Sequence, residues 1–351
     1  MNGFSVGAFS PCGIVPRGLY NSDNYCFLNV TLQSLLSCKE FVYFLSEMKK
    51  AAISKTEYPY LAKFTRFYKQ FKDWNKQSKF GAAFTPTFFY DTINEFNPIA
   101  TTWQEDAQEY LCFLLDKLSL EIRKAAPRIK AQSITENGEW MAKTGGRSRN
   151  AILLNDGEEF EPSHITDIFG GAFRSTVLKK GLQSSSRVEP FYCIHLDIRD
   201  SNINNLNAAM EKLTEKEKIE GYQDKGTEVQ ASKQLKIERT PNNLLLHLKR
   251  FDYDKNTFLP IKINKPLLYP KIFTLQPSWL SDPKKTAKYQ LYCVISHLGV
   301  QTQGGHYTCD LYHDLQEEWL HFDDSRVSII EDQDTVLNNW NAYLLYYRKI
   351  E

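Results

Sequence analysis

The sequence lacks any pair of cysteines separated by two residues, although seven cysteines are spread over its 351 residues. An odd number at wide spacing argues against a disulfide framework and against a four-cysteine zinc site. Reduced thiols of this kind are typical of cytosolic or nuclear proteins. We therefore expect a cytoplasmic protein, with the nucleus as the alternative location, and neither a bound metal nor another cofactor.

The sequence also lacks long apolar runs and an excess of charge of either sign. Its longest apolar stretches, such as 244–246 and 342–347, are far shorter than the roughly 20 residues that span a membrane. The first residues do not combine a basic segment with an apolar one, so no export signal is predicted. Lys and Arg number 43 against 42 for Asp and Glu, a net charge of +1. We therefore predict neither a membrane nor a nucleic acid as a partner.

Core-forming residues, in contrast, are abundant. Hydrophobic residues make up 42% of the chain and aromatic residues 13%, which excludes disorder of the whole chain. In the first third, apolar residues recur three and four positions apart and predict helices at 26–37, 60–74 and 105–126. Pro127 is expected to end the third helix. From 132 to 164 the polar composition predicts a surface insertion or flexible linker.

Strand patterns dominate the second half of the sequence. Between the first two of these strands, the pattern of residues 206–221 predicts an exposed helix. A helical part followed by a largely antiparallel β part is an α+β arrangement. The predicted strands lie at 191–198, 229–237, 244–251, 289–296, 306–312, 318–322 and 342–348.

Cys26 has the most informative setting of the cysteines. It follows Asn24, a plausible N-cap, and begins an amphipathic helix. The free amide groups and the positive dipole end of a helix favour the thiolate form there. A single cysteine is more often a buried inert thiol, and that interpretation stays open for Cys26 taken alone. It is our assignment for Cys38, Cys112, Cys193, Cys293 and Cys309, whereas the setting of Cys12 is uninformative.

A thiol that attacks an amide needs a base, a residue that orients the base, and donors for the developing oxyanion. His306 is the best candidate for the base, because the preceding Gly304 and Gly305 allow another backbone to approach closely. His195 and His247 lie inside apolar strands and are expected to be core residues. We expect His297 to flank the site.

Carboxylates and an amide complete the set of candidates. Asp323 and Asp324 end a strand one hairpin after His306, where a carboxylate can orient the imidazole, although Asp-Asp-Ser is otherwise an ordinary turn. Asn21 precedes Cys26 by five residues and offers an amide to the oxyanion, although asparagine is also a common turn residue. Each of these residues alone is weak evidence for a catalytic site, and the prediction depends on their occurring together.

Four segments resemble the motifs of the ubiquitin-specific proteases. The cysteine box of that family is similar to residues 18–29, GLYNSDNYCFLN, followed by LQSL at 32–35. Its glutamine/aspartate box resembles QEDAQEYL at 104–111, and its Leu-Lys-Arg-Phe strand resembles 248–251. Its histidine box resembles GGHY at 304–307, WLHFDD at 319–324 and AYLLYY at 342–347. The resemblance spans roughly 16–349 in family order and is highly specific.

The resemblance implies a papain-like cysteine protease with a helical thumb, a β-rich palm and β-strand fingers. We expect an N-terminal tail at 1–15 and a single catalytic domain at 16–351. Within that domain we expect the thumb at about 18–130, the insertion at about 132–164, the fingers at about 165–195 and 220–245, and the palm in the remainder.

The resemblance also implies roles for individual residues. Cys26 is the expected nucleophile, and His306 the general base and then the acid for the leaving lysine amine. Asp323 is expected to orient His306, with Asp324 as a second assisting acid, and Asn21 to form part of the oxyanion hole. Asp106 and Glu109 match positions that bind the basic C-terminal tail of ubiquitin. The narrow channel for the terminal glycines is expected to be lined by Phe251, Gly304, Gly305, Tyr307 and Tyr343.

Two departures from the family pattern are informative. Asp23 stands where the family usually has glycine, and it is expected to adopt a left-handed conformation if the loop requires one. The two Cys-x-x-Cys pairs that hold zinc in the fingers of many members are missing. Zinc-free fingers resemble one branch, which contains a fungal enzyme that works with an RNA-binding cofactor resembling a nuclear transport factor, and its metazoan counterpart.

The predicted function is thiol-dependent hydrolysis of the bond after the C-terminal glycine of ubiquitin. The expected partners are ubiquitin, ubiquitinated proteins and a regulatory protein, although the cofactor-binding segment of that branch precedes the catalytic domain. One alternative is a catalytically silent ubiquitin-binding scaffold, which the joint presence of Asn21, Cys26, His306 and Asp323 argues against. Another is a protease for a different ubiquitin-like modifier, which the sequence leaves open.

Overall fold

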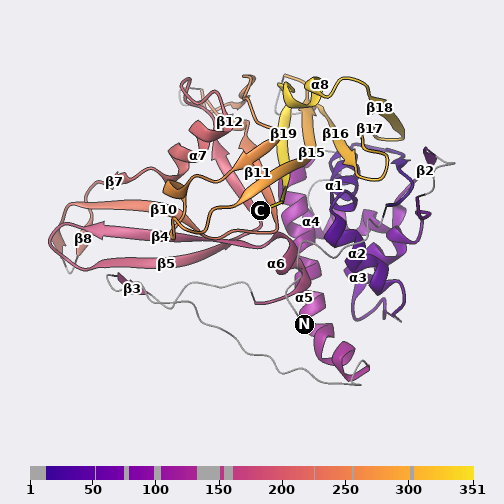
Figure 1. The fold of residues 1–351 in the computed structure, drawn as a ribbon, viewed down its shortest axis with the longest axis horizontal. Helices are drawn as coiled ribbons and strands as arrows, with labels where there is room; N and C mark the ends of the chain where they lie inside the picture. Colours follow the sequence, from indigo (N-terminus) through magenta and orange to yellow (C-terminus); the bar gives the residue numbers. More distant parts are fainter. Residues whose placement is uncertain are drawn as a thin grey trace.

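The computed structural model describes residues 13–51, 53–74, 79–98, 104–132, 151–153, 161–224, 226–254, 257–300 and 304–351. Most of the predicted tail and of the predicted insertion lies outside these residues. Helices from the first part of the chain pack beside a large sheet, and a second sheet projects away from both (Figure 1). None of the helices in the described ranges is long and apolar enough to cross a membrane.

The N-terminal helices surround α1 (Cys26–Leu36), whose eleven residues are all buried. This helix contacts α2 (Lys39–Met48) and α5 (Ala107–Gln132), and its other side lies against strand β16 (His306–His313). Because α1 is enclosed by helices and sheet, it forms the centre of the first hydrophobic core. The remaining helices here are α3 (Pro59–Tyr68), η1 (Thr87–Phe89), α4 (Tyr90–Phe96) and α6 (His164–Phe169).

Three of the helix predictions need correction. The predicted helix at 60–74 ends at Tyr68. The predicted stop at Pro127 is wrong, since α5 continues to Gln132; a proline removes one backbone donor and bends a helix without always ending it. The predicted helix at 206–221 ends at Thr214 as α7 (Leu206–Thr214), and the chain then enters a strand.

The large sheet carries the strands predicted for the end of the chain. Its order is β18-β17-β16-β15-β19-β11-β6, with β14 paired to β15, and the pairs are antiparallel except for β11 with β6. One face packs on α1 and the first core, and the other face packs on α7 and a second core. The strands are β6 (Cys193–Asp197), β11 (Asn243–Lys249), β14 (Ile272–Thr274), β15 (Lys288–Leu298), β16, β17 (Glu318–Asp323), β18 (Arg326–Ile330) and β19 (Ala342–Lys349).

A five-stranded sheet in the order β3-β5-β4-β10-β7 projects to the left in Figure 1. Arg174 on β4 forms a two-pronged ion pair with Glu238 on the neighbouring β10, at 2.7 and 2.8 Å. Two-pronged pairs of this kind fix the relative position of the strands. The strands are β3 (Ala151–Leu153), β4 (Gly171–Lys179), β5 (Ser184–Phe191), β7 (Glu217–Ile219) and β10 (Ala231–Arg239).

Three two-stranded sheets and two short helical segments complete the described fold. β1 pairs in parallel with β2, whereas β8 with β9 and β12 with β13 form antiparallel pairs. The elements are β1 (Arg17–Leu19), β2 (Gly81–Phe84), β8 (Gln223–Asp224), β9 (Thr227–Glu228), β12 (Phe251–Tyr253), β13 (Pro260–Lys262), η2 (Pro277–Trp279) and α8 (Asp334–Leu337).

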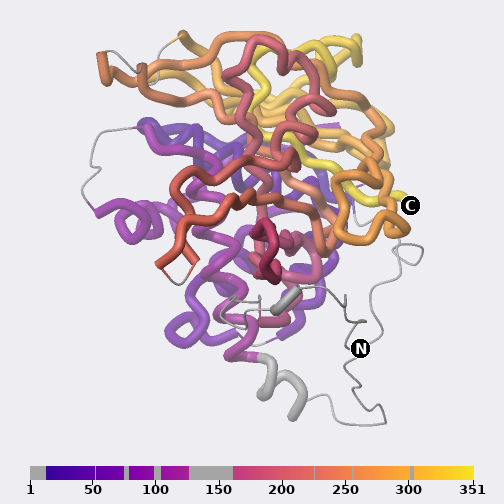
Figure 2. Tube along the Cα trace, turned by 90° about the vertical axis from the view of Figure 1, so that its left-hand side faces the viewer, coloured from indigo at the N-terminus to yellow at the C-terminus, as the bar shows by residue number. Residues whose placement is uncertain are grey.

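A close backbone contact joins the two ends of the chain. A Cβ on Gly18 would lie 2.2 Å from the carbonyl oxygen of Ser325, so only glycine fits there. The next residue, Leu19, donates its amide to the carbonyl of Asp324 at 2.8 Å. Together with the packing of α1 on β16, this contact brings the start of α1 to the large sheet. Figure 2 shows the N-terminal part of the chain, in indigo, beside the orange and yellow strands of the C-terminal part.

Candidate active site

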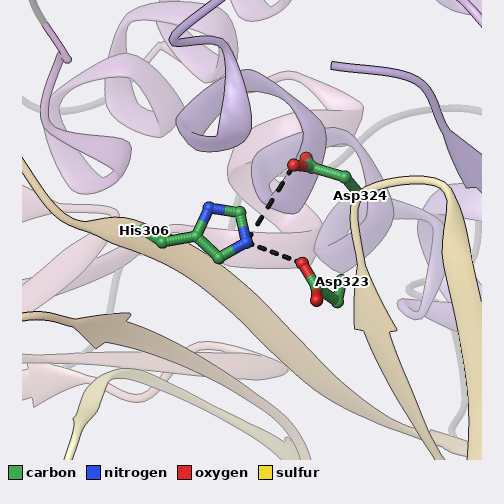
Figure 3. A group of neighbouring side chains, drawn as sticks. All are labelled: His306, Asp323 and Asp324. Atoms are coloured by element: carbon green, nitrogen blue, oxygen red, sulfur yellow. Dashed lines mark hydrogen bonds and ion pairs between the residues drawn. The ribbon is translucent and has the colours of Figure 1, made fainter.

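His306 and Asp323 form a hydrogen-bonded pair at the edge of the large sheet. His306 begins β16 and Asp323 ends β17, and because these strands are antiparallel neighbours the two residues meet at the same edge. The imidazole Nε2 lies 2.6 Å from Asp323 Oδ1 and 3.9 Å from Asp324 Oδ2 (Figure 3). This leaves Nδ1 free to face another group.

The other partner of His306 is Cys26. A hydrogen bond with Cys26 is the largest effect on the pKa of His306 and, together with the bond to Asp323, raises it to about 9, although burial acts in the opposite direction. An imidazole with such a pKa is protonated at neutral pH, so a positive charge lies beside the thiol. A protonated imidazole beside a thiol is the pairing on which cysteine nucleophiles depend.

Cys26 is the first residue of α1 and is 3% exposed. The prediction that Asn24 caps this helix is wrong, because Tyr25 occupies the N-cap position and no side chain caps it. The amide of Tyr25 instead donates to Asn21 Oδ1 at 3.0 Å, which fixes the loop before the helix. The expected left-handed conformation of Asp23 is also not found.

Asp324 connects the histidine strand to the cysteine helix. Its Oδ2 accepts a hydrogen bond from Asn21 Nδ2 at 3.0 Å, and its Oδ1 accepts one from Asn29 Nδ2 at 2.8 Å. Its backbone has a positive φ of 49°, which a non-glycine residue adopts only when the surroundings hold it. The Asn21 amide is therefore held between Asp324 and the start of α1.

The two glycines before His306 have different reasons to be glycine. Gly304 has a φ of 78° and open space around it, whereas a Cβ on Gly305 would lie 2.5 Å from His297 Nε2. His297 is buried and contacts the rings of Tyr307 and Phe251 at centroid distances of 4.7 and 5.0 Å. Burial lowers its pKa to about 4, so it is a neutral supporting residue under Gly305.

Asp106 and Tyr343 join the start of α5 to the large sheet. The Tyr343 hydroxyl donates to Asp106 Oδ2, while Asp106 Oδ1 accepts the amides of Gln108 and Glu109 at 2.7 and 3.2 Å. Asp106 therefore caps α5, and burial raises its pKa. The carboxylate of Glu109 is exposed beside it.

Two of the predicted channel residues contact Tyr343. Its ring contacts those of Phe251 and Tyr307 at 5.4 and 5.8 Å, and the side chains of Tyr343 and Tyr307 are buried. His247 is buried as predicted, and its Nδ1 lies 2.9 Å from Nδ1 of His195. The prediction of a core position for His195 is wrong, since that ring is exposed.

Two residues in contact with the candidate site were missing from the predicted set. Gln104 Nε2 donates to Cys26 Sγ at 3.1 Å, and buried Asn29 holds Asp324. The place of Gln104 at the start of its motif was a signal for the first. The three-residue spacing of Asn29 from Cys26, which places both on one helix face, was a signal for the second.

The described residues also contain one group with metal-ligand chemistry. Nitrogen or oxygen atoms of His306, Asp323 and Asp324 lie within 4.8 Å of one another. His306 bonds Asp323 inside the group and interacts with Cys26 outside it, and Asp324 accepts hydrogen bonds from two asparagines. We therefore interpret the group as acid–base machinery.

Residues 17–347 match the model of the family described as ubiquitin carboxyl-terminal hydrolase. The chain belongs to this family. The predicted membership of the ubiquitin-specific proteases is thereby confirmed.

Curated relatives match over most of this chain. Ubiquitin carboxyl-terminal hydrolase 24 of Arabidopsis thaliana is 32% identical over 95% of this chain and 65% of its own length. Ubiquitin carboxyl-terminal hydrolase 10 of Rattus norvegicus is 30% identical over 97% of this chain and 49% of its own. Ubiquitin hydrolase B of Dictyostelium discoideum is 36% identical over 71% and 56%. The chain thus spans between about half and two thirds of these relatives.

Solved structures share the fold. The yeast SAGA DUB module with an Sgf73 mutant contains a chain with a TM-score of 0.71 and 21% identity, matched over 99% of this chain and 71% of its own. The Ubp8/Sgf11/Sus1/Sgf73 module bound to ubiquitin aldehyde gives a TM-score of 0.72 at 21% identity, over 99% and 72%. These similarities confirm the predicted α+β, papain-like fold class.

Proposed function

We propose that this protein is a deubiquitinase that hydrolyses the peptide or isopeptide bond after the C-terminal glycine of ubiquitin. The observation that carries the proposal is the position of His306, which lies 2.6 Å from Asp323 Oδ1 through Nε2 and has Cys26 as the neighbour with the largest effect on its pKa. A thiol, an imidazole and a carboxylate in this order form the machinery of a cysteine protease. Family membership supplies the substrate.

The reaction then proceeds in two stages. The Cys26 thiolate attacks the glycine carbonyl, a sulfur–carbon bond forms, and the carbonyl electron pair moves to oxygen. His306 gives its proton to the leaving lysine amine as the carbon–nitrogen bond breaks. In the second stage His306 takes a proton from water, the hydroxide attacks the thioester, and the thiolate leaves with the electron pair of the broken bond.

Neighbouring residues hold these groups in place. Asp323 keeps the imidazole oriented, and Asp324 holds the Asn21 amide beside the start of α1. Nδ2 of Asn21 has a second hydrogen that does not point to Asp324, and this hydrogen and the Cys26 backbone amide are the proposed oxyanion donors. The role of Asp324 is thus to position Asn21 more than to contact His306, from which it lies 3.9 Å away.

The acidic residues at the start of α5 fit a basic peptide tail. Glu109 is exposed and has Asp106 and Glu105 nearby, and all three carboxyl groups have raised pKa values, with burial as the largest cause. A cationic ligand stabilises the ionised form of such carboxylates. We assign them to the tail of ubiquitin, and Phe251, Gly304, Gly305, Tyr307 and Tyr343 to the channel for its final glycines.

The same reasoning supports the expected organisation of the chain. We propose that residues 16–351 form one catalytic domain, with the N-terminal helices as thumb, the large sheet as palm and the five-stranded sheet as fingers. Six free cysteines in the described residues fit a reducing compartment, the cytoplasm or the nucleus. Ubiquitin and ubiquitinated proteins are the proposed partners. A regulatory protein partner is also proposed, because the matched SAGA module contains Sgf11, Sus1 and Sgf73.

Turnover of ubiquitin with a C-terminal fluorogenic amide tests the proposal. We expect the protein to release the fluorophore and Cys26→Ala to abolish release while still binding ubiquitin. Binding without turnover in the unmodified protein would instead indicate a silent scaffold. Faster turnover of another ubiquitin-like modifier would support the alternative that the protein is a protease for that modifier.

A further inference from the structure

We propose that Gln104 is a further catalytic residue, whose side-chain amide donates a hydrogen bond to the thiolate of Cys26. The amide Nε2 lies 3.1 Å from Cys26 Sγ, within hydrogen-bond distance for a sulfur acceptor. A thiolate carries no proton, so the amide is the donor and the sulfur accepts. This inference rests on the proposed hydrolysis, because that reaction forms and breaks a bond at this sulfur.

The residues just after Gln104 are fixed to the large sheet. Two residues later Asp106 caps α5 and accepts the Tyr343 hydroxyl, which fixes the start of α5 to the large sheet. The helices α1 and α5 pack against each other, and Cys26 is the first residue of α1. The glutamine amide thus reaches the sulfur from the α5 side, while His306 reaches it from the sheet.

A buried thiolate needs such donors. Cys26 is 3% exposed, so the surrounding protein must replace much of the solvation that water gives an anion. His306 supplies a cation, and Gln104 supplies a neutral donor that keeps its hydrogen throughout the reaction. The thiolate exists before attack and again when the thioester breaks, so the contact stabilises both the nucleophile and the leaving group.

A second glutamine–cysteine contact, inside α5, provides a matched control. Gln108 Nε2 donates to Cys112 Sγ, also at 3.1 Å, one turn into α5. Burial raises the pKa of Cys112 to about 12, although the hydrogen bond from Gln108 acts in the opposite direction. The glutamine amide alone therefore does not produce a thiolate at Cys112.

The pH dependence of alkylation by iodoacetamide tests the proposal without using ubiquitin. We expect Gln104→Met to move the midpoint of Cys26 alkylation upward by about one pH unit, because a hydrogen bond to a charged group is worth about a factor of ten. Gln104→Glu has the same size but places a carboxylate beside the sulfur, so its shift should be larger. Gln108→Met should leave the Cys26 midpoint unchanged.

Turnover separates this role from substrate positioning. We expect Gln104→Met to lower kcat about tenfold and to change KM less than twofold on fluorogenic ubiquitin, since the donor acts on the sulfur. A folded Gln104→Glu protein whose alkylation midpoint equals that of the unmodified protein would overturn the proposal. If Gln104→Met shifts the alkylation midpoint but the unmodified protein does not cleave ubiquitin, the role of Gln104 as a donor to Cys26 is supported and the proposed function is contradicted.

Discussion

At the scale of single residues, the candidate site depends on one histidine with two different partners. His306 contacts the Asp323 carboxylate through Nε2 and has the Cys26 thiol as a second neighbour, and interaction first with Cys26 and then with Asp323 raises its pKa to about 9. The protonated ring is already the acid that the leaving amine requires. Because this proton is lost as the pH rises, both the activity and the free energy of unfolding should depend on pH.

The pKa of His306 predicts a loss of activity at alkaline pH. Above about pH 9 the imidazole loses its proton, so kcat/KM should fall because the leaving amine no longer has its acid. A profile of kcat/KM between pH 6 and 10 checks this. An unchanged rate to pH 10 would contradict the assignment of His306 as the acid.

The free energy of unfolding should follow the same group. Its folded pKa lies above the ordinary value of 6.5, so the folded protein binds more protons between about pH 6.5 and 9. The stabilisation is fully present below pH 6.5 and is lost as the pH rises through 9. Urea unfolding should show this decline, and His306→Gln should remove most of it. An equal slope in both proteins would contradict the assignment.

Asn29 should matter to both stability and rate. Asn29→Ala removes the donor that holds Asp324 Oδ1, and loss of a hydrogen bond to a partly buried carboxylate costs about 1–3 kcal/mol. We expect lower stability in urea unfolding and a lower kcat, because Asp324 no longer fixes Asn21. The exposed Asn338→Ala is the control. Unchanged stability and rate in Asn29→Ala would refute this role.

At the scale of elements, the periodicity of apolar residues predicted the helices and strands that pack one face against a core. Helix α1 and most strands of the large sheet were found at nearly the predicted positions, whereas β14 and β18 of that sheet were not predicted. Strands β4 and β5 were not predicted, because residues such as Ser175, Thr176 and Arg187 give no clear alternation. Helix α2 was missed between two better-patterned segments.

The loop before β16 should tolerate no side chain at its second glycine. Gly305→Ala places a Cβ 2.5 Å from the buried His297 ring and 2.6 Å from a backbone carbonyl, so the loop must move and displace His306. We expect kcat/KM to fall by at least about tenfold, equivalent to about 1.4 kcal/mol. Gly221→Ala also has a positive φ but meets nothing within 4 Å, so it should lose some stability and keep its activity. Equal activity of both variants would disprove this account of Gly305.

The five-stranded sheet should need no zinc. Its described strands pair with one another and carry the ion pair of Arg174 with Glu238, and the sequence has no Cys-x-x-Cys pair. Metal analysis of the purified protein should therefore find no stoichiometric zinc, and a chelator should not change the melting temperature. One zinc per chain would overturn this view.

At the scale of the whole molecule, the candidate site exists because distant parts of the chain meet. The sequence identified Cys26, His306, Asp323 and Asp324 by motif. It did not indicate that Asp324 bonds Asn21 and Asn29, or that Gln104 reaches the sulfur. Those contacts depend on how α1 packs on β16 and how closely Gly18 approaches Ser325. Such distances follow from tertiary packing, which residue spacing does not determine.

The most direct test of the central claim is the site of covalent reaction with ubiquitin. Ubiquitin bearing a C-terminal thiol-reactive group should form one adduct per chain, and mass spectrometry of its peptides should locate it at Cys26. Cys26→Ala should form none, whereas Cys112→Ala should react as the unmodified protein does. No adduct with a folded protein, or an adduct at another cysteine, would contradict the proposal that Cys26 is the nucleophile of a deubiquitinase.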